Sequence, residues 1–136
     1  MESVTIGQVA KRANVGVETV RFYEREGLID QPPRRVSGYR AYPADTADRV
    51  RFIKRAKELG FALKEIKELL ALRLAPGATC GQVRKRALGK IADIEEKVRS
   101  LQRMKRALEK LADACDGQGA VSECPILDAL DEGKRQ

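Results

Sequence analysis

The chain has 136 residues, of which 43% are hydrophobic and 35% charged, and its formal net charge is +7. This length suits one or two small domains, and the sequence holds no apolar run of about 18 residues that could span a membrane. There is also no charged-then-apolar leader, so we expect a cytoplasmic protein without membrane contact. Three cysteines without an export signal indicate thiols in a reducing compartment, and the absence of His removes the commonest general base.

The first half of the chain predicts a compact helical domain. Residues 5–8 read Thr-Ile-Gly-Gln, a capping box from which a first helix runs to about Arg12. Residues 13–16 form a turn, and a second helix follows over residues 17–26 and stops at Gly27. Two short helices joined by such a turn are a helix-turn-helix.

The second helix has two predicted faces. Val20 and Phe22 are expected to turn inward. The side chains expected outside are Glu18, Thr19, Arg21 and Tyr23. All three Tyr and all three Phe precede residue 62, so the first half can form the globule, and its basic charge suggests a polyanion, most often nucleic acid.

A small β wing and two more helices complete the predicted domain. Residues 39–42 alternate like a short strand after the turn signal Ser37-Gly38. Amphipathic helices are predicted over residues 45–59 and 63–74. The residues expected to face inward on the first of these are Val50, Ile53, Ala56 and Leu59. Residues 1–75 thus predict a winged helix-turn-helix, and the whole fold is expected to be all-α with a small β wing.

Residues 76–114 predict one long helix that pairs with a second copy of the chain. Apolar residues recur at alternating steps of four and three, the spacing of a coiled-coil seam that Lys105 interrupts once. The seam residues are Ala87, Ile91, Ile94, Val98, Leu101, Leu108 and Ala112. We expect an antiparallel coiled-coil homodimer, followed by a metal-binding loop and a short C-terminal helix in residues 115–136.

The three cysteines suggest why the pairing is antiparallel. Cys80 opens the long helix and Cys115 follows its end, so about 50 Å of helix separates them. They cannot share a ligand within one chain. Antiparallel pairing would instead bring Cys80 beside Cys115 and Cys124 of the second copy. Three thiolates without imidazole or oxygen select a soft metal ion, whereas zinc would require a fourth ligand in a closed site.

Several ordered motifs resemble those of the MerR family of transcriptional regulators. The motifs are residues 5–10, 18–24, 27–28, 38–42, 51–53 and 59–61. Two positions depart from the family pattern, because Ala62 and Pro43 stand where the family usually has helix-capping residues. The resemblance implies a homodimer that binds double-stranded promoter DNA in an overlong spacer. On metal capture it would distort that spacer so that RNA polymerase can engage both promoter elements, a form of indirect readout.

The expected DNA contacts come from the second helix and the wing. Val17 and Glu18 lie near the helix N-terminus, which suits contacts to base edges. The residues expected to contact mainly the backbone are Arg21, Tyr23, Arg40 and Tyr42.

The cysteine spacing limits which metal ion the resemblance implies as the effector. Cys80, Cys115 and Cys124 are similar in spacing to the thiols of the mercury(II)-responsive members, and lead(II)- and cadmium(II)-responsive members share this spacing. Copper-responsive members usually lack a thiol at the position of Cys80, and zinc-responsive members add ligands. A thiol enzyme or redox protein is a weaker alternative, because Cys-x-x-Cys, His and a βαβ pattern are all missing. A metal buffer would leave the helix-turn-helix without a role.

Overall fold

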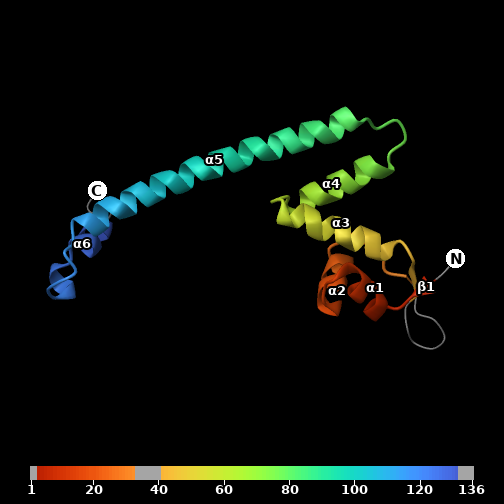
Figure 1. The fold of residues 1–136 in the computed structure, drawn as a ribbon, viewed down its shortest axis with the longest axis horizontal. Helices are drawn as coiled ribbons and strands as arrows, with labels where there is room; N and C mark the ends of the chain where they lie inside the picture. The colour runs from red at the N-terminus through yellow and green to blue at the C-terminus, as the bar shows by residue number, and fades with distance from the viewer. Residues whose placement is uncertain (1–2, 33–40, 132–136) are drawn as a thin grey trace. The chain divides into compact units, whose positions relative to one another are not determined.

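The computed structural model describes residues 3–32 and 41–131, and the chain forms two compact units, Met1–Lys90 and Ile91–Gln136. The elements of the first unit are β1 (Ser3–Val4), α1 (Ile6–Ala13), α2 (Val17–Arg25), β2 (Tyr42–Pro43), α3 (Thr46–Glu58), α4 (Leu63–Leu74) and the start of α5 (Cys80–Asp113) (Figure 1). The second unit holds the rest of α5, the 3-10 helix η1 (Val121–Glu123) and α6 (Pro125–Asp131).

Helices α1 and α2 begin and end as their sequences predict. The Thr5 backbone N–H donates to Gln8 Oε1 at 2.8 Å, and the Gln8 N–H donates back to Thr5 Oγ1 at 3.2 Å, which completes the capping box. Asn14 ends α1 in the left-handed region at φ 57°. Gly27 follows α2 at φ 76°, a conformation that glycine adopts without steric cost.

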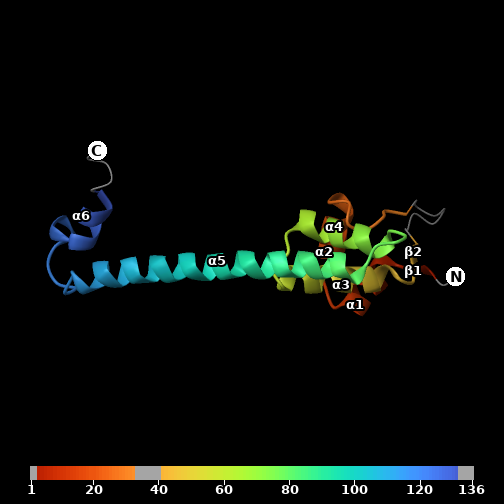
Figure 2. The same ribbon diagram turned by 90° about the horizontal axis from the view of Figure 1, so that it is seen from above.

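The small sheet has two antiparallel strands in the described part of the chain. Strands β1 and β2 lie side by side (Figure 2). Ser3 lies opposite Pro43, and Val4 lies opposite Tyr42. A strand ending at Tyr42 was expected, but its partner at the N-terminus was not, because two residues carry no detectable periodicity. Most of the expected wing, residues 33–40, lies outside the described residues.

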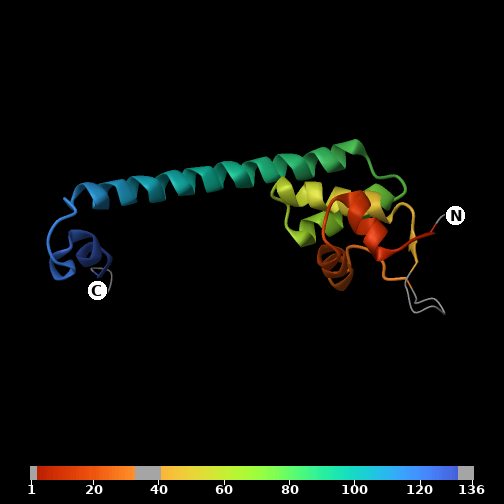
Figure 3. The same cartoon turned by 60° about the horizontal axis from the view of Figure 1, so that its bottom comes forward.

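The core of the first unit lies where α1 packs against α2 and α3, and α3 against α4 (Figure 3). Its fully buried members include Val9, Val20, Val50, Ile53 and Ile66. The prediction that Leu59 faces inward is wrong, since its side chain is 52% exposed. Leu59 is the C-cap of α3, where the helical face no longer continues.

Helix α5 starts with a capping box that the sequence reading missed. The Thr79 N–H donates to Gln82 Oε1 at 2.7 Å, and the Gln82 N–H donates to Thr79 Oγ1 at 3.3 Å. Pro76 and Gly77 precede this box, with Gly77 at φ 80°, and the helix therefore begins at Cys80. Its first turns run antiparallel to α4 (Figure 1) and belong to the first compact unit, which extends to Lys90.

The expected fold class, all-α with a small β wing and a long helix after a winged helix-turn-helix, is confirmed. Among residues 3–32 and 41–131, no helix combines the length and the apolar character needed to cross a membrane.

Candidate functional site

The outer face of α2 carries a charged pair at its start. Glu18 and Arg21 are both exposed, and Arg21 Nη1 lies 2.8 Å from Glu18 Oε1. Val17, the first residue of α2, is half-buried and packs against the core. The N-terminal half of α2 therefore presents one acidic and one basic side chain to solvent, as expected for these two residues.

Two cations of α3 fix the turn between α1 and α2. Arg51 Nη1 donates to the Arg12 carbonyl oxygen at 2.8 Å, and Lys54 Nζ donates to the Asn14 carbonyl oxygen at 3.1 Å. Both carbonyls lie at the C-terminus of α1, where they have no partner within the helix and where the helix dipole attracts positive charge. The sequence reading missed these contacts, although two basic residues three positions apart on the predicted third helix were a usable signal.

The prediction that Tyr23 lies on the outer face of α2 is wrong. Tyr23 is 3% exposed and belongs to the core cluster, and this burial raises the pKa of its phenol. Phe22, which was expected inside, is only half-buried, and its ring faces the cations of Arg25 and Lys57 at 6.0 and 5.7 Å. Adjacent residues of a helix differ in direction by about 100°. A small error in the assumed orientation of this short helix therefore assigns neighbouring residues such as Phe22 and Tyr23 to the wrong sides.

Tyr42, which was also expected to contact DNA, has a buried side chain. Tyr42 is 1% exposed, and its hydroxyl donates to the carboxylate of Glu24 on α2. The side chain supports α2 from within the core, because β2 pairs with β1 and turns Tyr42 inward. Arg40, the other expected contact of the wing, lies outside the described residues.

The three thiols are free and occur in both units. Cys80 is exposed at the first position of α5, within the first unit, whereas Cys115 and Cys124 are half-buried in the second. The Gly117 N–H donates to Cys115 Sγ at 3.4 Å, and Gly117 itself has φ 79°. Within the described residues of this single chain, no three His, Cys, Asp or Glu side chains gather as a metal site.

The apolar stripe of α5 is open to solvent in the single chain. The exposed members are Leu88, Ile91, Ile94, Val98, Leu101, Met104 and Leu108, at 42–62% exposure. Leu101, Met104 and Leu108 line a shallow apolar groove that ends at Ala112. A stripe of this length on one helix face is typical of a surface that a second helix covers.

A capped helix-turn-helix beside a small antiparallel sheet defines a DNA-binding domain of the winged-helix class. Two family models agree with this class. "MerR HTH family regulatory protein" matches residues 4–72, and "MerR, DNA binding" matches residues 47–111. The chain belongs to the MerR family of transcriptional regulators. This is a family of DNA-binding regulators and not of enzymes, which sets the thiol-enzyme alternative aside.

Named relatives extend along almost the whole chain. It is 42% identical over 125 residues to a mercuric resistance operon regulatory protein of Bacillus cereus, covering 92% of this chain and 95% of that protein. The crystal structure of a Ralstonia metallidurans transcription regulator in complex with lead(II) is similar at a TM-score of 0.82 and 37% identity. A MerR of Bacillus megaterium in complex with mercury(II) is similar at a TM-score of 0.71 and 38% identity. Both matches cover 93% of this chain and 98% of the other.

Proposed function

We propose that this chain is a cytoplasmic, mercury(II)-responsive transcription regulator that binds promoter DNA and controls mercury resistance genes. The observation that carries the proposal is the distribution of three free thiols at the two ends of a helix whose apolar face is open. The mercuric resistance regulatory protein of Bacillus cereus and the regulator solved in complex with mercury(II), both similar to this chain, support the same ion.

The proposed effector site joins two copies of the chain. Helix α5 has 34 residues, which span about 50 Å at the usual rise, and Cys80 and Cys115 lie at its opposite ends. In an antiparallel homodimer, Cys80 of one copy meets Cys115 and Cys124 of the other, and symmetry gives two identical sites. Gly117 and Gly119, at φ 79° and 95°, let the loop between Cys115 and Cys124 turn sharply.

The donor set fits mercury(II). Three thiolates with no imidazole anywhere in the sequence form a soft site, and mercury(II) is a soft ion that accepts low coordination numbers. When bound, the ion would hold the three sulfurs together and so constrain the two chains. The protein contributes the thiols, the stiffness of α5 and the loop that closes on them.

Lead(II) or cadmium(II) is the second candidate effector. The similarity to a regulator solved in complex with lead(II) favours lead(II) in particular, and three thiolates suit lead(II) as well. The fold, the dimer and the DNA-binding surface would then be the same, and the difference would lie in the coordination that the loop after Cys115 permits.

The proposed DNA surface uses the exposed start of α2. Val17 and Glu18 would approach base edges, and Arg21 would contact the phosphate backbone, as would Arg40 of the wing. Tyr23 and Tyr42 are left out because both are buried. Metal capture would change the relative orientation of two such surfaces, distort the promoter spacer and allow RNA polymerase to engage it.

Transcription in vitro from a promoter with an overlong spacer, with mercury(II), lead(II) and cadmium(II) supplied in competition, tests the proposal. We expect mercury(II) to activate at the lowest concentration and each of Cys80→Ser, Cys115→Ser and Cys124→Ser to remove activation while keeping DNA binding. Activation by lead(II) at a lower concentration than mercury(II) would establish the second candidate. Activation that survives all three substitutions would contradict both.

A further inference from the structure

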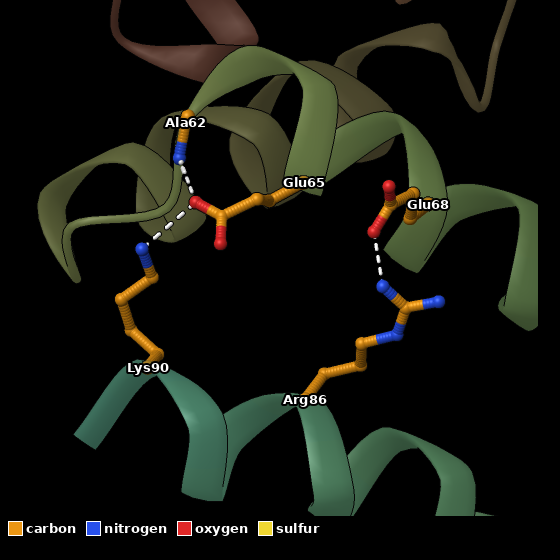
Figure 4. A network of polar contacts seen from close by, with 5 residues as sticks. All are labelled: Ala62, Glu65, Glu68, Arg86 and Lys90. Carbon is orange, nitrogen blue, oxygen red and sulfur yellow. Dashed lines mark hydrogen bonds and ion pairs between the residues drawn. The ribbon is translucent and has the colours of Figure 1, made fainter. Parts of the chain in front are cut away.

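Two ion pairs join α4 to the first turns of α5 (Figure 4). Lys90 Nζ lies 2.8 Å from Glu65 Oε1, and the Arg86 guanidinium pairs with the Glu68 carboxylate. The partners are spaced by one helical turn on each helix, so both pairs lie on the facing sides of α4 and α5. Because the two contacts lie at different points along the helix axes, they oppose both rotation and sliding of one helix relative to the other.

Lys90 is unusually buried for a lysine. The residue is 9% exposed, and charged side chains are seldom buried to this extent unless they are paired. Its ammonium also lies 5.5 Å from the centre of the Phe61 ring, which belongs to the connection between α3 and α4. The Lys90 side chain therefore contacts α4 and the turn before it together.

Glu65 has two roles at the start of α4. Its Oε1 accepts a hydrogen bond from the Ala62 N–H at 2.8 Å, and the same oxygen accepts from Lys90 Nζ (Figure 4). Ala62 is the N-cap of α4 and has no side-chain oxygen. The side-chain hydrogen bond that caps this end of the helix therefore comes from Glu65. The position of α5 is thus tied to the first turn of α4.

The position of these pairs along the chain suggests their purpose. Lys90 is the last residue of the first compact unit, and α5 continues without interruption to Asp113. Residues 80–90, the segment of α5 that these ion pairs hold against α4, also contain Cys80. A displacement of Cys80 can therefore reach α4, and through α4 the helix-turn-helix, by way of these two ion pairs as well as through the short connection between Leu74 and Cys80.

We propose that Glu65 and Lys90, supported by Glu68 and Arg86, are positioning residues that pass metal capture from α5 to the DNA-binding unit. The inference rests on the proposed function, because it concerns the step between that metal site and the promoter. Neither Glu65 nor Lys90 is among the proposed metal ligands or the proposed DNA contacts. Without the pairs, both binding events would persist but the free energy that couples them would fall.

Glu65→Gln separates the ion pair from the helix cap. The amide oxygen can still accept from the Ala62 N–H, as in a capping box with Gln, but the charge facing Lys90 is gone. Lys90→Met removes the ammonium and keeps an apolar stem, so it tests the same loss without a buried cation. Lys90→Arg retains the charge and is the conservative rescue. Glu58→Gln is the matched control, since Glu58 pairs with Arg55 on the exposed side of α3.

Four quantities are measured on each full-length variant: mercury(II) affinity, operator affinity, the melting temperature and mercury(II)-induced transcription. We expect Glu65→Gln and Lys90→Met to keep both affinities and to lose about 2- to 30-fold of the induction, the range for changes within a coupling network. Lys90→Arg and Glu58→Gln should induce like the parent.

Unchanged induction in Glu65→Gln and Lys90→Met would overturn the inference, as would a loss that only follows operator affinity and melting temperature, which indicates a purely structural role. A parent chain that responds to none of mercury(II), lead(II) and cadmium(II) would instead overturn the proposed function, and the inference with it. The two failures are distinguishable because one appears in the parent and the other only in the variants.

Discussion

The side chains of Tyr42 and Glu24 join the small sheet to the helix-turn-helix, because the Tyr42 hydroxyl donates a hydrogen bond to the Glu24 carboxylate. Tyr42 is buried on β2, and Glu24 is half-buried on α2. The strand next to the wing therefore supports α2 from inside the domain, and the Tyr42 hydroxyl is already engaged there.

Tyr42→Phe should lower the free energy of unfolding by about 1.5–3 kcal/mol, the usual contribution of a hydrogen bond to a charged group. The ring still fills its place, so only the hydroxyl is lost. Chemical denaturation measures the change, and the salt dependence of DNA binding should stay as in the parent. A smaller salt slope with unchanged stability would show that Tyr42 contacts phosphate after all.

Ala62→Ser should stabilise the domain by about 1 kcal/mol. Glu65 already accepts from the Ala62 N–H, but no side chain at the N-cap accepts from the first turn of α4. A serine hydroxyl would complete the capping box. The denaturation midpoint should rise without a change in slope, whereas Ala62→Val, which offers no side-chain acceptor at the N-cap, should not raise it. An unchanged midpoint for the serine variant would contradict this reading of the cap.

The fold could be predicted from the sequence wherever one local signal fixed one local structure. The capping box at Thr5, the glycine after α2 and the proline and glycine before α5 each correspond to an observed boundary. Strand β1 could not be predicted, because it exists only through its pairing with β2. Tyr23 and Leu59 were assigned to the wrong sides because the periodicity is poorly defined in a short helix and at a helix end.

Arg21→Ala should weaken binding to all DNA sequences and reduce the salt slope by about one unit. Arg21 is exposed and its ion pair with Glu18 is exposed as well, so the substitution should cost little stability. Fluorescence anisotropy at several salt concentrations measures both quantities. Arg55→Ala, which removes an exposed cation from α3, is the control. Equal slopes for the parent and Arg21→Ala would remove Arg21 from the DNA surface.

Val98→Glu combined with Leu101→Glu should break the dimer. Each burial of a large aliphatic side chain is worth about 1.5–3 kcal/mol, and two-fold symmetry doubles every loss. Both side chains are exposed in the single chain, at 46% and 62%. Sedimentation measures the association, and operator affinity should fall with it because two half-sites are held at once.

Arg99→Glu combined with Ser100→Glu is the matched control for the seam. These residues are neighbours of Val98 and Leu101 on α5 but lie outside the apolar stripe. This variant should remain a dimer. If the Val98 and Leu101 variant also sediments as a dimer, the antiparallel seam is wrong.

The candidate site could be predicted only in part, because its pieces lie in different parts of the chain. The thiols, the exposed start of α2 and the apolar stripe are all visible as residue types at fixed spacings. The contacts of Lys54 with Asn14 and of Lys90 with Glu65 join residues distant in sequence, and no local pattern identifies the partner of either lysine. Such contacts depend on how the helices pack.

Metal binding by a mixed heterodimer is the most direct measurement of the proposal that the site spans two subunits. A Cys80→Ser chain keeps Cys115 and Cys124, and a Cys115→Ser chain keeps Cys80. Combined in one antiparallel dimer, they hold one complete set of three thiols at one end of the seam. Titration with mercury(II) in the presence of a competing thiol should give one tight site per heterodimer and none in either parent homodimer. A heterodimer that binds mercury(II) no more tightly than its parents would contradict the cross-subunit site.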